Sequence, residues 1–126
     1  MNPTGLVAAL AAMGGIWLGH VLVRRIEFAA PVLALPAALV AMLGAVLGGL
    51  SLLMKNPSAI AAGILALTFL YDAVEFYRQE KRVQRGHAPA NPRNPRHARI
   101  LRAFPAATLR DPLGEVGQTV AREKTS

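Results

Sequence analysis

The chain has 126 residues, of which 53% are hydrophobic and 17% are charged, with a formal net charge of +7 and no cysteine. Soluble domains contain about 25% charged residues, so this composition favours a membrane-embedded protein. The lack of cysteine excludes disulfides, thiolate metal sites and a cysteine nucleophile. A positive excess of this size is typical of proteins that contact nucleic acid, anionic lipid or an acidic protein surface.

The first predicted element is a membrane span over residues 5–23, an uncharged run that ends at Arg24 and Arg25. At about 1.5 Å rise per residue the run is about 28 Å long, close to the ~30 Å thickness of a hydrocarbon core. The leader before it has no Lys or Arg, and the positive pair follows the apolar run. These flanks favour a retained span over a cleaved signal peptide.

A second uncharged run predicts a span over about residues 30–54, which ends before Lys55. It is longer than one crossing needs, and the surplus is expected at its Pro31 end. Pro31 suits the first turn of a helix, whereas Pro36 is expected to kink or restart it.

A third span is predicted over residues 58–77, with Pro57 at its opening and two acids, Asp72 and Glu75, in its final turns. Acids are tolerated near the end of an apolar helix because they lie close to the interface. The sequence therefore predicts an all-α integral membrane protein with a three-helix transmembrane domain over residues 1–78.

The distribution of basic residues predicts the orientation of these spans. Three spans place the termini on opposite sides of the membrane, and one side holds only Lys55. Cytoplasmic loops are enriched in Lys and Arg, so the N-terminus is expected outside and the C-terminal tail in the cytoplasm of a bacterial inner membrane. Six basic residues near that face are candidate contacts of anionic lipid headgroups: Arg24, Arg25, Arg78, Lys81, Arg82 and Arg85.

Each span contains two small residues four positions apart. The pairs are Gly15 and Gly19, Gly44 and Gly48, and Ala59 and Gly63. Such pairs let helix backbones approach closely, but they also arise by chance in a chain rich in Ala and Gly. A three-helix unit has little interior, so self-association or a larger membrane partner is expected.

Residues 79–126 are predicted to form a basic, largely disordered cytoplasmic tail, with disorder from residue 106 onward. Asn94 and Pro95 are suited to start a short interfacial helix through Phe104. In such a helix Ile100, Leu101 and Phe104 would share one face, with Arg96, Arg99 and Arg102 on or beside the other. A solvated tail with an accidental pattern is the alternative, because so short a helix rarely holds alone.

Catalysis, cofactor binding and nucleic-acid binding are not expected. The chain has no HExxH, GxSxG, GxGxxG or P-loop motif, and His87 and His97 lack metal-ligand spacing. No zinc spacing or helix-turn-helix pattern accompanies the positive charge.

The ionisable residues inside the spans form the candidate polar cluster: His20, Asp72 and Glu75. In the predicted topology all three lie at a similar depth near the cytoplasmic face. A histidine facing a carboxylate there suits proton transfer or cation binding. The alternative is a structural hydrogen bond or ion pair between the first and third spans, with Glu75 also able to pair with Arg78.

Three passages of the sequence are distinctive: Met1-Asn2-Pro3-Thr4-Gly5-Leu6, Gly19-His20 with Glu27 following, and the run from Glu75 to Gly86 that leads to Asn91-Pro92. Together they resemble a family of small bacterial membrane proteins, domain of unknown function 4491. The resemblance covers about residues 1–95 and implies a three-span fold without an established activity. It marks His20, Glu27, Glu75, Gln79, Glu80 and Arg82 as matches to family positions, and this chain departs from it by its basic tail from about Arg96.

These observations favour a non-enzymatic inner-membrane protein that acts as an accessory or scaffold subunit of a larger membrane complex. The alternative is a small homo-oligomeric ion or proton channel or transporter that uses His20 and Glu75. A holin-like protein is a third hypothesis, which rests only on small size and a basic C-terminus.

Overall fold

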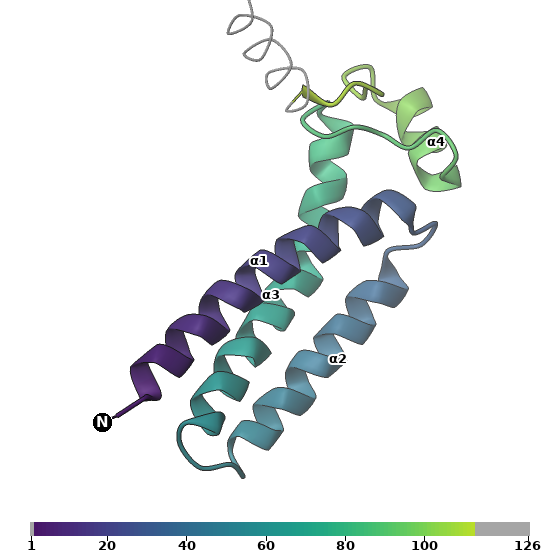
Figure 1. The fold of residues 1–126 in the computed structure, drawn as a ribbon. Helices are drawn as coiled ribbons and strands as arrows, with labels where there is room; N and C mark the ends of the chain where they lie inside the picture. The colour runs from purple at the N-terminus through teal and green to yellow at the C-terminus, as the bar shows by residue number, and fades with distance from the viewer. Residues whose placement is uncertain (1, 113–126) are drawn as a thin grey trace, which may run out of the picture.

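A computed structural model describes residues 2–112, which form four helices and no strand. The helices are α1 (Thr4–Ala29), α2 (Ala34–Ser51), α3 (Ser58–Gln84) and α4 (Pro95–Ala103). Figure 1 shows α1, α2 and α3 side by side, with the short α4 at the end where α1 and α3 finish. Each of the three long helices is long and apolar enough to cross a membrane. The chain is therefore an all-α, multi-pass membrane protein.

Helix α1 is longer than the predicted span, because it continues through Arg24 and Arg25 to Ala29. No residue between Arg24 and Phe28 opposes a helix. The helix ends where Pro31 restricts the residue before it, and Ala30 has an extended backbone with φ −73° and ψ 125°.

Helix α2 begins at Ala34, so the surplus of the second run lies at its Pro31 end. The roles expected for the two prolines are wrong: Pro31 lies in the linker, and Pro36 lies in the first turn of α2. Proline fits there because the first N–H groups of a helix have no intrahelical acceptor.

Helix α3 continues past Tyr77 to Gln84, so Lys81 and Arg82 belong to this helix rather than to an irregular tail. The chain leaves it through Gly86, whose φ of +74° is the left-handed conformation common after helix ends.

The packing of the bundle depends on α3, which makes the main contacts with both α1 and α2. Gly44 of α2 lies so close to α3 that an added Cβ would be 2.8 Å from the carbonyl oxygen of Ala66. The Gly15 and Gly19 pair of α1 also faces α3, whereas Gly63 has no comparably close neighbour. Two of the three small-residue pairs thus contribute to helix contacts.

The first part of the expected tail, through residue 112, is folded against the end of the bundle. Helix α4 occupies the segment predicted to be helical, and its Ile100 packs with Val83, Ala88 and Ala90. The N–H of Ala90 donates to the carbonyl oxygen of Thr108 at 2.8 Å. Residues 106–112 lie outside the four helices, and the rest of the region expected to be disordered, residues 113–126, lies outside the described residues.

Candidate functional site

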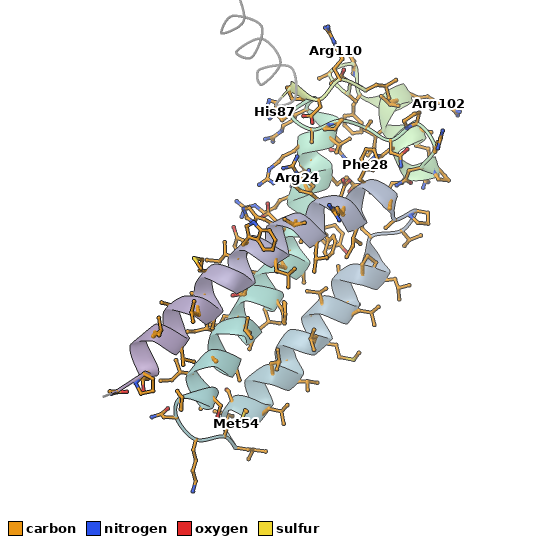
Figure 2. All side chains as sticks on the ribbon, in the orientation of Figure 1. Arg24, Phe28, Met54, His87, Arg102 and Arg110 are labelled. Atoms are coloured by element: carbon orange, nitrogen blue, oxygen red, sulfur yellow. The ribbon has the colours of Figure 1, made fainter. Side chains whose placement is uncertain are left out.

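The end of the bundle that carries α4 contains most of the described charged residues. Figure 2 shows Arg24, His87, Arg102 and Arg110 at this end, with Met54 at the opposite end. We refer to these as the α4 end and the Met54 end. Three features bear on function: a buried ion-pair network and a basic crevice at the α4 end, and a crevice beside Asp72 nearer the middle of α1 and α3.

The ion-pair network begins at Glu27, which continues the buried stripe of α1 one turn after Val23. Glu27 is 1% exposed. Its Oε1 atom accepts from Arg96 Nη2 at 2.9 Å and lies 2.8 Å from His97 Nε2. Arg96 Nη1 also binds Glu80 Oε1 of α3 at 2.7 Å. One guanidinium therefore joins α4 to both α1 and α3.

His97, which is fully buried, has its orientation set by a backbone group. The N–H of Asn91 donates to His97 Nδ1 at 2.8 Å, so Nδ1 is the acceptor nitrogen. The ring proton then lies on Nε2, which donates it to Glu27. His97 is thus a structural partner of Glu27.

Asn94 attaches the start of α4 to the end of α1. Its Oδ1 atom accepts from the N–H of Arg96 at 3.0 Å, which is the helix cap expected from the sequence. Its Nδ2 atom donates to the carbonyl oxygens of Phe28 at 3.1 Å and Ala30 at 3.0 Å. Phe28 belongs to the last turn of α1, where helices leave carbonyl acceptors unpaired, and Ala30 directly follows the helix.

Arg96 corrects the arrangement expected for α4. The sequence pattern places it with Arg99 and Arg102 on or beside the solvated face, but Arg96 is buried and the other two are exposed. The apolar face is present in part, since Ile100 is buried and Phe104 is exposed.

Glu75 belongs to a second group of ion pairs, which lies along α3. Arg82 Nη2 binds Glu75 Oε1 at 2.5 Å, and Arg78 Nη1 lies 3.6 Å from Glu75 Oε2. Arg82 also donates to Gln79 Oε1 at 2.7 Å, and Arg78 donates to the hydroxyl of Tyr71. The expected pair of Glu75 with Arg78 is present, but Arg82 is the closer partner.

Asp72 and His20 lie beside a separate crevice of about 380 Å³ between α1 and α3. Its other lining residues are Ile16, Leu67, Thr68 and Tyr71. The structure therefore brings together two members of the predicted cluster, His20 and Asp72. The third member, Glu75, is held by arginines and does not line this crevice.

Asp72 is a buried carboxylate, 5% exposed, that packs against the backbone of Gly19. No group in residues 2–112 donates a hydrogen bond to it. Within residues 2–112, every side-chain nitrogen or oxygen that is fully enclosed has a hydrogen-bond partner. The Asp72 carboxylate oxygens have none, so they are not fully enclosed and are open to the crevice. His20, on the same crevice, is exposed and likewise has no hydrogen-bond partner within these residues.

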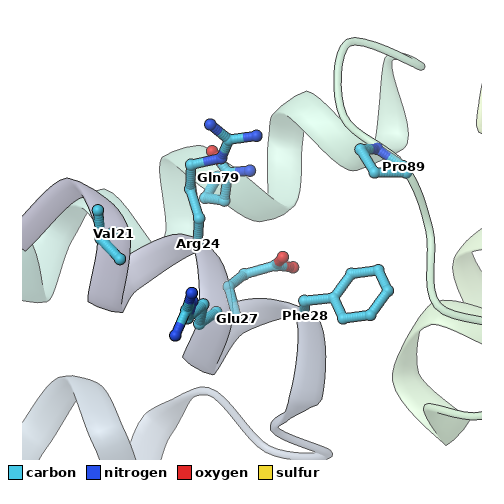
Figure 3. A pocket seen from close by; sticks show the side chains of 7 residues that line it. Val21, Arg24, Glu27, Phe28, Gln79 and Pro89 are labelled. Atoms are coloured by element: carbon cyan, nitrogen blue, oxygen red, sulfur yellow. The ribbon is translucent and has the colours of Figure 1, made fainter. Parts of the chain in front are cut away.

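The basic crevice has a volume of about 390 Å³ and lies between α1, α3 and the loop before α4. Figure 3 shows the side chains of Arg24, Glu27, Gln79 and Pro89 around it, with Phe28 beside them. The other lining residues are Val21 and Arg25. Arginines beside apolar groups at a helix end are suited to bind an anionic headgroup.

The six candidate headgroup contacts are all exposed at the α4 end, but they differ in their partners. Arg78 and Arg82 are paired with Glu75. Four have no carboxylate partner among the described residues: Arg24, Arg25, Lys81 and Arg85.

Comparison with known proteins identifies the family. A family model described as Domain of unknown function (DUF4491) matches residues 2–94. The chain belongs to this family. No curated protein and no solved structure matches the chain. The matched region contains Glu27, Glu75 and Glu80, whereas Arg96 and His97 lie just beyond it.

Proposed function

We propose that this DUF4491 protein is a non-enzymatic accessory or scaffold subunit of a larger assembly in the bacterial inner membrane. The observation that carries the proposal is the small interior of the membrane bundle. In α2 only Ala37 and Gly44 are buried, and large apolar side chains face outward on all three spans. Apolar exposure alone is compatible with lipid, but a thin bundle with close helix contacts offers wide surfaces to other helices.

The state of the carboxylates supports a structural role over a catalytic one. Glu27, Glu75 and Glu80 each bind an arginine, and Glu27 also binds a buried histidine. Breaking the pair of Glu27 with Arg96, which is buried on both sides, costs about 3–5 kcal/mol. Glu27 and Glu80 stabilise the junction of α4 with the bundle, which suits a rigid docking platform, whereas Glu75 binds arginines of its own helix.

The proposed orientation places the N-terminus outside and the α4 end in the cytoplasm. Its support is the charge difference between the ends, because Lys55 is near the Met54 end and the unpaired arginines gather at the α4 end. A phosphatase fused after Ser126 is expected to be inactive, and a fluorescent protein there is expected to fluoresce. Phosphatase activity would contradict this orientation.

The proposed lipid partners are anionic phospholipids of the inner leaflet. Among the six candidate headgroup contacts, four are exposed and have no carboxylate partner in the described residues: Arg24, Arg25, Lys81 and Arg85. Each basic residue near an anionic surface contributes favourably to its binding.

The test of the scaffold function is purification from native membranes in mild detergent, followed by a native gel and mass spectrometry. A stoichiometric complex with other membrane proteins is the expected result. Recovery of this chain without other proteins, together with intact membrane complexes in a deletion strain, would contradict the proposal.

A second candidate function is a small homo-oligomeric proton channel or transporter, and Asp72 is the observation that favours it. An unpartnered carboxylate beside a histidine at membrane depth suits proton exchange. Since arginines hold Glu75, Asp72 replaces it as the carboxylate of this hypothesis. Proton flux into liposomes should then fall with His20→Ala and Asp72→Asn, and unchanged flux in both variants would contradict it.

A further inference from the structure

We propose that the crevice beside Asp72 is a self-association surface, occupied in the membrane by the same crevice of a second, parallel copy of this chain. The imidazole of His20 in each copy donates a hydrogen bond to the carboxylate of Asp72 in the other. This contact between copies does not depend on the proposed role as a subunit of a larger assembly.

The first step of the argument is the lack of a partner for two polar groups at membrane depth. Asp72 is 5% exposed and accepts no hydrogen bond from the described residues, and the His20 ring has no hydrogen-bond partner there either, although it interacts electrostatically with Asp72 of the same chain. In hydrocarbon, unlike in water, no solvent supplies the missing hydrogen bonds, so such groups usually face another protein segment. The crevice therefore requires an occupant with polar groups of its own.

The second step is that the crevice is complementary to itself. It presents one acceptor, the Asp72 carboxylate, and one group with a donor N–H, the His20 imidazole. The two lie at the same depth, since Gly19, which precedes His20, packs directly against Asp72. A two-fold axis along the membrane normal preserves depth, so an axis that passes beside the crevice places each His20 at the level of the other copy's Asp72 and facing it.

The third step is that apolar residues surround the polar pair. Ile16 and Leu67 line the same crevice and are 56% and 72% exposed. The remaining polar groups of the crevice are already bonded within one copy: Thr68 Oγ1 donates to the Ile64 carbonyl at 2.9 Å, and the Tyr71 hydroxyl accepts from Arg78. A second copy would thus cover an apolar rim and satisfy the two groups that have no partner.

Single-cysteine crosslinking in native membranes tests the contact, because the chain has no cysteine of its own. Leu67→Cys places a thiol on the crevice. Leu43→Cys is a matched control on α2, 47% exposed and at similar depth, since the neighbouring Gly44 packs against Ala66, next to Leu67. We expect oxidation to give a crosslinked dimer with Leu67→Cys and little with Leu43→Cys. Equal crosslinking at the two positions would overturn the proposal.

Mixed dimers separate pairing between copies from pairing within one copy. In the Leu67→Cys background, His20→Ala alone or Asp72→Ala alone removes both interchain pairs. Co-expression of His20→Ala and Asp72→Ala copies with different tags restores one of the two pairs. Membrane hydrogen bonds of this kind change association by about 3- to 30-fold each. The mixed dimer should therefore crosslink more than either single-variant dimer and less than the parent.

Equal crosslinking in the mixed and single-variant dimers would overturn the proposal, because His20 and Asp72 would then act within one chain. Loss of this dimer leaves the scaffold function unaffected, since that function is judged by other proteins in the native complex. The two failures are therefore distinguishable.

Discussion

Replacement of Arg96 by methionine tests whether the ion-pair network attaches α4 to the bundle. The change keeps an unbranched apolar stem and removes the guanidinium. That group donates to Glu27 Oε1 at 2.9 Å, to the Glu27 carbonyl, to Glu80 Oε1 at 2.7 Å and to the Ala30 carbonyl at 3.3 Å. Its loss leaves the carboxylate of Glu27, which is 1% exposed, without the positive charge of Arg96 beside it.

The expected magnitude follows from burial. Removing one partner of a buried ion pair costs about 3–5 kcal/mol. His97 still donates to Glu27 at 2.8 Å, so the lower value of about 3 kcal/mol is expected. Since about 1.4 kcal/mol corresponds to tenfold in an equilibrium constant, local opening of α4 should become about 100-fold more frequent.

Hydrogen exchange followed by mass spectrometry, on protein in lipid nanodiscs, measures this opening. Peptides that cover α4 and the loop before it should lose protection in Arg96→Met, while peptides of α2 stay unchanged. Arg99→Met is the matched control, because Arg99 is exposed on the same helix. Equal protection of α4 in the two variants would refute the reasoning. Glu27→Gln combined with Arg96→Met should cost less than the sum of the single changes, because the two side chains contact each other.

Three further changes have expected outcomes. Gly44→Leu should lower the stability of the bundle, measured by thermal unfolding in detergent, by about 1–3 kcal/mol, because a Cβ there would lie 2.8 Å from the Ala66 carbonyl oxygen. Gly49→Ala is the control and should change little, because the space around Gly49 is open. Asn94→Ala should increase exchange at the start of α4, with a loss of about 1 kcal/mol from the cap alone, and an equal effect of Arg93→Ala would contradict that role. Arg24→Gln combined with Arg25→Gln should reduce the amount of anionic lipid that stays bound to the protein in native mass spectrometry, whereas Lys55→Gln should not. Equal amounts of bound lipid in the double variant and in Lys55→Gln would count against lipid binding at the basic crevice.

The three membrane spans could be predicted from the sequence because long uncharged runs have few other structures available to them. Their ends could not be located as well. Arg24 and Arg78 end the apolar runs without ending the helices, since arginine is a good helix former. Hydropathy locates the segment that lies in lipid, and helix propensity with Pro31 and Gly86 locates where the helices stop.

The polar cluster shows why a similar depth in the membrane does not predict contact. The rotation of each helix about its own axis decides which side chains face one another. His20, Asp72 and Glu75 do lie near the same end of the bundle, but Asp72 packs on Gly19 of α1, whereas Glu75 binds Arg82 of its own helix. Seven residues is about two full turns, so Glu75 and Arg82 share one face of α3. That spacing is visible in the sequence and was a usable signal for the pair.

Arg96 and His97 gave no comparable signal, because their partner Glu27 is about 70 positions away in the chain. In an amphipathic α4, an arginine beside Arg99 and Arg102 is expected in solvent, and only the position of α1 makes it a buried ligand of Glu27. A chain that ended at Asn94 would retain Glu27 and Glu80 and lose the cation that joins them. Residues 95–112, which follow the family match, are therefore part of the same folded unit. The boundary drawn at residue 78 divides α3 and separates the buried carboxylate of Glu27 from its partner Arg96.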